Sequence, residues 1–159
     1  MFVIYRLYVP ADFEALYAIE ELCFEPAFRF GRRMMRRLVS RLNSATWIAE
    51  DAAQMAGFAI VEWNREKAVI AAYIQTIEVA PIRRNQGTAR ELLAHLEASA
   101  VAAGAALIWL HVDATNSGAI RLYEAGGYQC QGRQENYYPG GRAALIYVKR
   151  LGPSEPVTG

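Results

Sequence analysis

The segment from Val79 to Leu93 has the residue types that hold an anion. A predicted strand ends at Val79, a basic turn containing Gly87 follows, and a predicted helix begins. The first turn of a helix has N–H groups without intrahelical partners and a partial positive charge. Gly87 permits a close backbone approach, and Arg83 and Arg84 add full charges. The segment predicts a pyrophosphate cradle, although an ordinary strand-to-helix connection with exposed arginines has the same pattern.

A strand–helix–strand unit must position this turn. Residues Ala68–Val79 predict a strand, and the helical spacing of apolar residues over Gly87–Ala103 predicts a helix that Gly104 ends. The run Ala106–Val112 is apolar, as in a strand buried on both faces. Two strands joined by one helix should pair in parallel through a right-handed crossover.

The rest of the chain predicts further helices and strands around that unit. Polar turns at 51–54 and 64–67 separate successive strands, which should therefore pair antiparallel. The remaining predicted elements are a strand over Val3–Tyr8, a helix that opens at Pro10–Asp12 and ends before Pro26, a helix over Gly31–Leu42, strands over Thr46–Glu50 and Met55–Trp63, a short helix over Asn116–Ala125, and strands over Tyr128–Glu135 and Ala143–Leu151 around the loop 136–142.

Composition and charge are those of a globular domain. The 159 residues are 53% hydrophobic and 21% charged, which predicts a single domain over 1–151 with a flexible tail over 152–159 and excludes a disordered chain. A net charge of +1 disfavours a polycation that coats nucleic acid. No apolar run approaches the ~20 residues that span a bilayer, and the first residues lack a signal-peptide pattern. Cys23 and Cys130 lack the CxxC spacing of a zinc or redox site. We therefore expect a cytoplasmic protein without a metal.

Two motifs in the second half of the chain resemble those of the GNAT N-acetyltransferases. Arg84-x-x-Gly87-x-Ala89 is similar to the family's acyl-CoA signature, and the segment from Asn116 to Tyr128 is similar to its Asn-x-x-Ala-x-x-Leu-Tyr-x-x-x-Gly-Phe segment. The resemblance implies a GNAT fold of class α/β (α+β), with a mixed, mostly antiparallel sheet of about seven strands, helices on both faces, and a splayed parallel pair that forms the CoA cleft. It implies acetyl-CoA as the cofactor and CoA as the product. The implied cofactor-binding residues are Ile77, Val79, Arg84, Asn85, Gln86, Gly87, Thr88, Ala89 and Asn116.

Two further segments resemble the protein N-terminal acetyltransferases of that superfamily. They are Pro10–Phe24 and the motif Asn136-Tyr137-Tyr138-Pro139. Bacterial enzymes of the group acetylate a ribosomal protein, and eukaryotic ones acetylate nascent chains. The resemblance implies an acyltransferase that moves an acetyl group to the α-amine of a protein or peptide by direct attack on the thioester. It implies no membrane partner and no direct nucleic-acid partner, and it is compatible with a position near the ribosome. It also implies a monomer or weak dimer.

One strand residue departs from the bacterial enzymes of the group. The bacterial enzymes carry a Leu-Glu-Val pattern where this chain has Leu110-His111-Val112. The Leu-His-Val pattern resembles the Met-type eukaryotic enzymes. Tyr73 on the preceding strand also resembles a residue of those enzymes. The resemblance implies base work by Tyr73 and His111 and protonation of the leaving group by Tyr123. A peptide α-amine has a pKa of about 8, against about 10.4 for lysine, so a weak base such as neutral histidine suffices. A strand N–H near Val79 would hold the thioester oxygen.

Each of these residues also fits a plainer role. His111 could be a core histidine, Tyr73 could fill a sheet face, and Tyr123 could pack its helix. Glu78 is the second candidate for the base, although it points away from the core if its strand neighbours point inward. His95, on a helix flanked by leucines, is expected to be structural.

Aromatic residues and an arginine stripe lie outside the two motifs. The aromatic candidates either pack an apolar first side chain of a peptide or belong to the peripheral core. The arginines over 32–41 fit an acidic protein or ribosomal RNA, or a solvated helix face. The candidates for the peptide slot are Phe24, Phe28, Tyr137 and Tyr138.

Two other functions remain compatible with these patterns. A GNAT enzyme for a small-molecule amine, such as an aminoglycoside, polyamine or amino acid, would have acidic residues converging on the acceptor cleft. A non-catalytic CoA-binding module would lack both a base and the Tyr123 equivalent, yet both candidates are present here.

Overall fold

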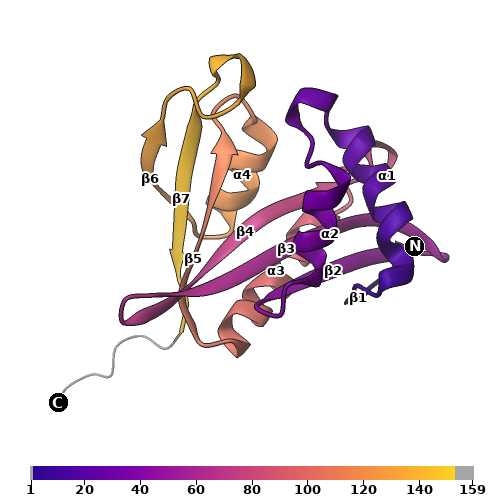
Figure 1. Cartoon of the computed structure of the whole chain (residues 1–159), viewed down its shortest axis with the longest axis horizontal. Coiled ribbons are helices and arrows are strands. Elements are labelled where there is room, and N and C mark those ends of the chain that lie inside the picture. The colour runs from indigo at the N-terminus through magenta and orange to yellow at the C-terminus, as the bar shows by residue number, and fades with distance from the viewer. Residues whose placement is uncertain (1, 153–159) are drawn as a thin grey trace.

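Seven strands form one mixed sheet in the computed structural model, which describes residues 2–152. Their order across the sheet is β1-β2-β3-β4-β5-β7-β6 (Figure 1). Strands β4 and β5 pair in parallel, and every other neighbouring pair is antiparallel. The predicted mixed, mostly antiparallel sheet is confirmed. The strands are β1 (Val3–Leu7), β2 (Ser44–Asp51), β3 (Gln54–Glu66), β4 (Val69–Val79), β5 (Ala105–Asp113), β6 (Gln129–Gln134) and β7 (Ala144–Arg150).

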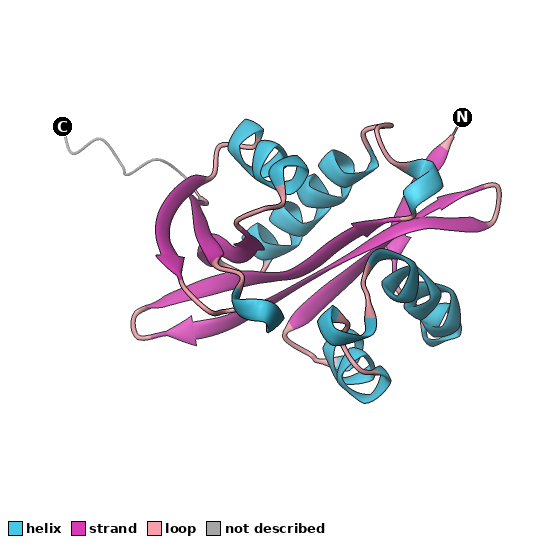
Figure 2. Ribbon diagram, turned by 90° about the horizontal axis from the view of Figure 1, so that it is seen from above, coloured by secondary structure: helices cyan, strands magenta, loops and turns pink. Residues whose placement is uncertain are grey.

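Helices cover both faces of the sheet (Figure 2). Helices α1 and α2 pack on one face against β2, β3 and β4, and α3 packs against β2 to β5. Helix α4 joins the same apolar core as α3. No helix of residues 2–152 is long and apolar enough to cross a membrane. The helices are α1 (Phe13–Cys23), α2 (Arg32–Ser40), α3 (Thr88–Ala102) and α4 (Ser117–Ala125).

Each face of the sheet has its own apolar core. Leu16 of α1 and Met35 of α2 are buried in one cluster with Phe58. Leu96 of α3 belongs to the other, with Ile108 of β5. Because side chains alternate between the two faces along a strand, the middle strands bury residues on both sides. A polar side chain in the middle of β4 is therefore enclosed whichever face it is on.

Strands β4 and β5 separate part-way along the sheet. Their paired register ends at Tyr73 and Trp109, while β4 continues beside β3 as far as Val79 and β5 continues beside β7. The register between β3 and β4 shifts at this point, with Gln75 as the additional residue of β4. An inserted residue bends its strand and increases the local twist. The predicted splayed pair is confirmed, and the bend lies immediately after Tyr73.

Two predicted boundaries differ from the structure by three residues. The turn expected at 64–67 is wrong: β3 continues to Glu66, and the chain reverses at Lys67 with φ +56°. Residues 64–66 pair with β4 at the end of a hairpin, where their side chains are exposed to solvent. Because an exposed strand end is also polar, polarity alone does not identify a turn there. The helix expected from Pro10 begins at Phe13 after a 3-10 turn. The tail expected over 152–159 lies outside the described residues beyond Gly152.

Candidate active site

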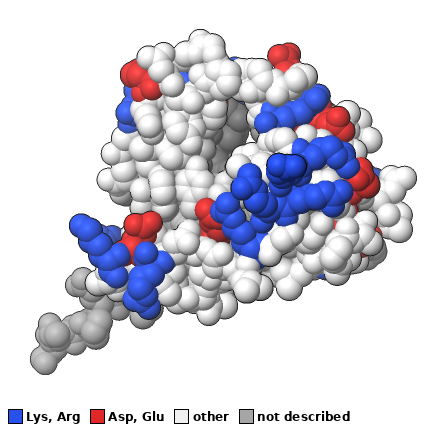
Figure 3. Space-filling model, in the orientation of Figure 1, with Lys and Arg blue, Asp and Glu red and all other residues white. Residues whose placement is uncertain are grey.

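A cavity of about 710 Å³ opens where β4 and β5 separate. Residues 74–77 of β4 and 110–113 of β5 form its sides, and the α1–α2 loop, residues 24–31, covers one end. Side chains from α4 and the β6–β7 loop close the other end. The space-filling view shows the surface hollowed between these two halves of the molecule (Figure 3).

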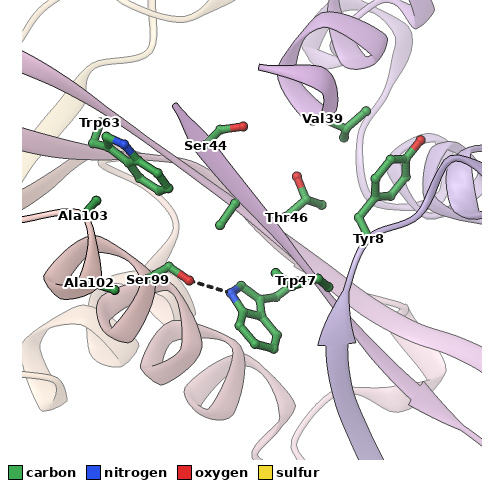
Figure 4. A pocket seen from close by; sticks show the side chains of 11 residues that line it. Tyr8, Val39, Ser44, Thr46, Trp47, Trp63, Ser99, Ala102 and Ala103 are labelled. Atoms are coloured by element: carbon green, nitrogen blue, oxygen red, sulfur yellow. Dashed lines mark hydrogen bonds between the residues drawn. The ribbon is translucent and has the colours of Figure 1, made fainter. Parts of the chain in front are cut away.

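A second hollow, of about 460 Å³, lies at the edge of β2. Trp47 and Trp63 line it, and the Trp47 indole N–H donates to the Ser99 hydroxyl over 2.9 Å (Figure 4). It contains none of the predicted site residues. Predicted site residues instead line the cavity between β4 and β5, among them Asn116, His111 and Tyr123.

Tyr73 and His111 meet across the separating strands. The Tyr73 hydroxyl oxygen lies 2.8 Å from Nδ1 of His111, and Nε2 of His111 lies 3.3 Å from Oε1 of Gln134. The neutral tautomer with its proton on Nε2 satisfies both contacts, since Nδ1 then accepts the Tyr73 hydroxyl proton. Tyr137 stacks on the imidazole with ring centroids 4.3 Å apart. The sequence reasoning named Tyr73 and His111 but missed Gln134.

Burial shifts the pKa values of Tyr73 and His111 in opposite directions. It raises the pKa of the Tyr73 hydroxyl well above its ordinary value, so tyrosinate is disfavoured. It lowers the pKa of the His111 imidazole below 6.5, against a smaller upward effect of Gln134. His111 is thus neutral at physiological pH, and its Nδ1 can take a proton.

His111 lines the cavity, and Tyr73 is not among the lining residues. Tyr123 lies on the α4 side of this cavity. Its side chain is buried, and burial raises the pKa of its hydroxyl, so this residue keeps its proton. Asn116 also lines the cavity and begins α4, where its Oδ1 accepts a hydrogen bond from the Ala119 N–H over 3.1 Å. The structure therefore brings Tyr123 and Asn116 to the cavity that His111 lines.

The turn before α3 has the backbone that an anion site needs. Gly87 is the N-cap residue with φ +82°, Asn85 has φ +63°, and no side chain caps the helix. Nothing lies within 4 Å of the position that a Cβ on Gly87 would occupy. A helix start without a side-chain cap, beside open space at Gly87, fits a pyrophosphate. The same turn carries Gln86, Thr88 and Ala89.

The two arginines of this turn are engaged with the protein. Arg84 donates from Nε to the Val79 carbonyl oxygen over 3.2 Å, and its Nη2 lies 3.5 Å from the Cys23 sulfur. Arg83 forms an ion pair with Asp51. Both guanidinium groups hold the turn against neighbouring elements, and their charges remain beside α3.

The predicted peptide slot is divided between two positions. Phe24 and Phe28 of the α1–α2 loop line the cavity, as does Tyr138. Arg142 lies over the Phe28 ring at 4.4 Å and links the two loops across the cavity. Tyr137 is not among the lining residues and instead packs on His111. Burial raises the pKa of the Tyr138 hydroxyl to about 12.

The other predicted residues lie away from the reacting atoms. Glu78 is buried on the α1 face, does not line the cavity, and has a pKa raised well above 4.5, first by desolvation. A neutral carboxylic acid is a poor base, so this position disfavours its second-ranked role. His95 stacks between Tyr5 and Trp47, which confirms a structural role.

Basic side chains gather over α2 (Figure 3). Arg32 and Arg36 pair with Glu14, and Arg36 also lies 3.8 Å above the Phe13 ring. Arg41 pairs with Glu62. Much of the stripe is therefore held by the protein's own acidic and aromatic groups. Within residues 2–152, no group of three or more His, Cys, Asp or Glu side chains lies where it could hold a metal ion.

The chain is similar to acetyltransferases over most of its length. A family model described as the Acetyltransferase (GNAT) family matches residues 13–128. Over 86 residues the chain is 38% identical to the ribosomal protein bS18-alanine N-acetyltransferase of Escherichia coli K12. This alignment covers 54% of this chain and 55% of that protein. Over 102 residues it is 35% identical to the streptothricin acetyltransferase of Streptomyces lavendulae. That alignment covers 62% of this chain and 51% of that protein. The match thus spans about half the length of these curated relatives.

A solved structure extends this similarity to nearly the whole chain. The ribosomal-protein-S18-alanine N-acetyltransferase from Escherichia coli has a TM-score of 0.84 at 28% identity, and the alignment covers 96% of each chain. The splayed sheet and the site at its opening therefore lie within a fold that the two proteins share.

Proposed function

The chain belongs to the acetyltransferase (GNAT) family, and from that membership we propose that it transfers the acetyl group of acetyl-CoA to the N-terminal α-amine of a protein or peptide. The observation that carries this proposal is the Tyr73–His111 hydrogen bond of 2.8 Å at the point where β4 and β5 separate. It provides a weak, neutral base beside the cavity. An α-amine, with a pKa near 8, needs no stronger one.

Bound acetyl-CoA supplies the acetyl group as a thioester, and the residues of the chain handle the protons. As the acceptor nitrogen forms its bond to the carbonyl carbon, the Tyr73 oxygen takes a proton from that nitrogen. The hydroxyl proton of Tyr73 passes at the same time to Nδ1 of His111. This shared movement avoids a free tyrosinate, which burial disfavours. The imidazolium that results returns its proton to solvent.

Two other groups act on the atoms that gain negative charge. A strand N–H near Val79 holds the carbonyl oxygen, because β4 has no partner strand on its β5 side beyond Tyr73. When the carbon–sulfur bond breaks, its electron pair goes to sulfur, and the Tyr123 hydroxyl provides the proton that gives the CoA thiol. Tyr123 regains a proton from solvent. The products are the N-acetylated acceptor and CoA.

The turn from Arg84 to Ala89 is the proposed site of the CoA pyrophosphate, with Asn116 beside the cofactor arm. The first side chain of the acceptor is proposed to enter between Phe24, Phe28 and Tyr138. The bacterial relative in the comparison is named for acetylating a ribosomal protein, so a ribosomal protein is the first acceptor to consider. Such an acceptor would place the enzyme in the cytoplasm, near ribosomes.

A small-molecule amine is the second candidate acceptor, because one relative is a streptothricin acetyltransferase. Such a cation would be recognised by free carboxylates. Of the acidic residues that line the cavity, Asp113 pairs with Arg142, and Glu20 accepts a hydrogen bond from the Phe30 N–H and is 0% exposed. Only Glu25 remains among the lining acids, and this arrangement favours the peptide acceptor.

The test is a screen of short peptides that differ at their first two residues. Each is incubated with acetyl-CoA, and the release of CoA thiol is measured. Peptides with a free α-amine and no lysine should react, and a subset of first residues should react fastest. Turnover of streptothricin or a polyamine, with no turnover of any peptide, would assign the enzyme to the second class.

A further inference from the structure

Two glutamate side chains are buried against each other between α1 and β4. Glu20 is 0% exposed and Glu78 is 3% exposed, and the two carboxyl groups are close enough to shift each other's pKa. The Thr76 hydroxyl donates to Oε2 of Glu78 over 2.8 Å, and the Phe30 N–H donates to Oε2 of Glu20 over 3.1 Å. The Oε1 atom of each has no hydrogen-bond partner among residues 2–152. One proton held between the two carboxyl groups would give both oxygens a partner.

The groups around the pair favour one shared proton over two charges. Arg29 is the cation that acts on Glu20, and it lowers the pKa of that carboxyl. The neighbouring Cys23 thiol is neutral because burial raises its pKa, and Arg84 contacts the Cys23 sulfur. Burial raises the pKa of both carboxyl groups, and contact with Glu20 raises that of Glu78 further. The proton therefore belongs mainly to Glu78, and Glu20 keeps the charge that attracts the Phe30 N–H.

Glu20 lines the cavity, and Glu78 does not. The backbone of Phe30 is held on both sides of its Cα, since its N–H donates to Glu20 and its carbonyl oxygen accepts the Tyr17 hydroxyl over 2.9 Å. Phe24 and Phe28 precede it in the same loop and line the cavity. Glu78 lies on β4, the strand that also carries Tyr73. The two carboxyl groups thus connect the loop to the strand of the site.

We propose that Glu20 and Glu78 form a proton-sharing pair that positions the α1–α2 loop as the wall of the acceptor cavity. Both are positioning residues that act through the loop. That the cavity holds the acceptor rests on the proposed function. When the shared proton is lost, two adjacent anions repel each other without solvent screening. The loop then separates from β4, and acceptor affinity falls.

This arrangement predicts a defined pH dependence of the free energy of unfolding. Both carboxyl groups have raised pKa values in the folded protein, so the folded state binds more protons than the unfolded state above the ordinary glutamate pKa. Stability contributed by the pair is therefore lost as the pH rises from that value through the raised one. The pair is most stabilising on the acidic side of this window.

The test compares wild-type enzyme with Glu78→Gln, using Glu21→Gln as a matched control. Glutamine can donate to Glu20 and accept from Thr76 without titrating, and Glu21 is an exposed acid on the same helix. Hydrogen-exchange protection factors of the loop amides and the melting temperature are measured from about pH 6 to about pH 9. In wild type and Glu21→Gln, loop protection should fall about tenfold over this range, as expected for losing a hydrogen bond to a charged acceptor. In Glu78→Gln it should stay constant, and the melting temperature should fall less.

Two further measurements keep the outcome decisive. The infrared spectrum of wild-type enzyme should show a protonated carboxyl band at neutral pH, whether or not the variant folds. With any peptide that is turned over, KM for the peptide should rise at alkaline pH in wild type and not in Glu78→Gln, while KM for acetyl-CoA stays unchanged in both. Equal pH dependence of loop protection in wild type and Glu78→Gln, or absence of the carboxyl band, would overturn the proposal. If no peptide is acetylated, the proposed function fails, yet the exchange and infrared results still test the pair.

Discussion

The imidazole of His111 is held in one orientation by neighbours on four sides. Tyr73 and Gln134 contact its two nitrogens, Tyr137 stacks on its face at 4.3 Å, and Trp109 lies 5.3 Å away. Such contacts limit ring rotation and fix which nitrogen faces Tyr73. Orientation matters more than basicity here, because the α-amine is already partly neutral at physiological pH.

Replacing His111 by alanine should lower kcat by about 10²-fold or more, the usual range for losing a general base. Acetyl-CoA affinity should stay close to wild type, because the imidazole lies away from the turn before α3. Steady-state kinetics with the best peptide of the screen measure both quantities. His95→Ala is the control, since it removes the other histidine of the chain, which packs between aromatic rings. A folded His111→Ala enzyme with more than about half of wild-type kcat would exclude the base role.

The pH dependence of kcat gives a second test of the base role of His111. Because burial lowers the pKa of this imidazole below 6.5, the base is lost only when the pH falls below that value. The acid limb of kcat should therefore lie below pH 6.5 in wild type and disappear in His111→Ala.

Tyr123→Phe should lower kcat and leave the acid limb unchanged, because the base is intact and only the proton donor to sulfur is lost. Burial raises the pKa of the Tyr123 hydroxyl, so no titration of this residue is expected near neutral pH. Comparing kcat profiles and melting temperatures of the two enzymes measures this. An acid limb that moves with the substitution would assign Tyr123 to the base relay.

The contact between Tyr73 and His111 follows from positions that the sequence alone could suggest. Both lie on strands expected to be parallel neighbours, and the resemblance to N-terminal acetyltransferases named both. Gln134 could not be found in this way, because its contact with His111 depends on how β6 pairs with β7. That pairing has a register shift between Cys130 and Gly132, and polar residues on an exposed edge strand give no sign of such a shift.

At the scale of elements, the site depends on a strand that bends. The order strand, helix and apolar strand predicted β4 and its parallel partner. It did not predict that Gln75 would be inserted relative to β3. A bulge depends on the pairing of two strands and leaves no local signal in this sequence. The separation of β4 from β5 was therefore expected from the resemblance, and its mechanical cause was found in the structure.

The turn before α3 provides the prediction at this scale. Acetyl-CoA should raise the melting temperature of wild-type enzyme, because a ligand that binds only the folded state stabilises it. Gly87→Glu should abolish this rise, since it adds a negative charge in the open space before α3 and a side chain at φ +82°.

Gly87→Asn is the matched control, because asparagine tolerates a left-handed backbone without adding charge. It should fold as well as Gly87→Glu or better and keep more of the shift. An undiminished shift in Gly87→Glu would place the cofactor elsewhere.

For the whole molecule, the decisive feature is that helices cover both faces of the sheet. A strand residue that points away from one core then points into the other. Glu78 was expected to face away from the core, yet it is enclosed beneath α1 beside Glu20. Charge alone suggests an exposed side chain, and the structure shows a buried carboxyl group whose pKa is raised well above its ordinary value. Pairs of this kind depend on tertiary packing between α1 and β4, which local patterns do not specify.

The central claim is that the enzyme acetylates α-amines, and one peptide tests it directly. The peptide has a free N-terminal alanine and one internal lysine, so both amines compete for the same enzyme at neutral pH. After limited turnover with acetyl-CoA, fragmentation mass spectrometry locates the acetyl group. We expect acetylation at the N-terminal nitrogen, with little at lysine, whose amine is neutral in only about one molecule in a thousand. Acetylation mainly on the lysine side chain would contradict it.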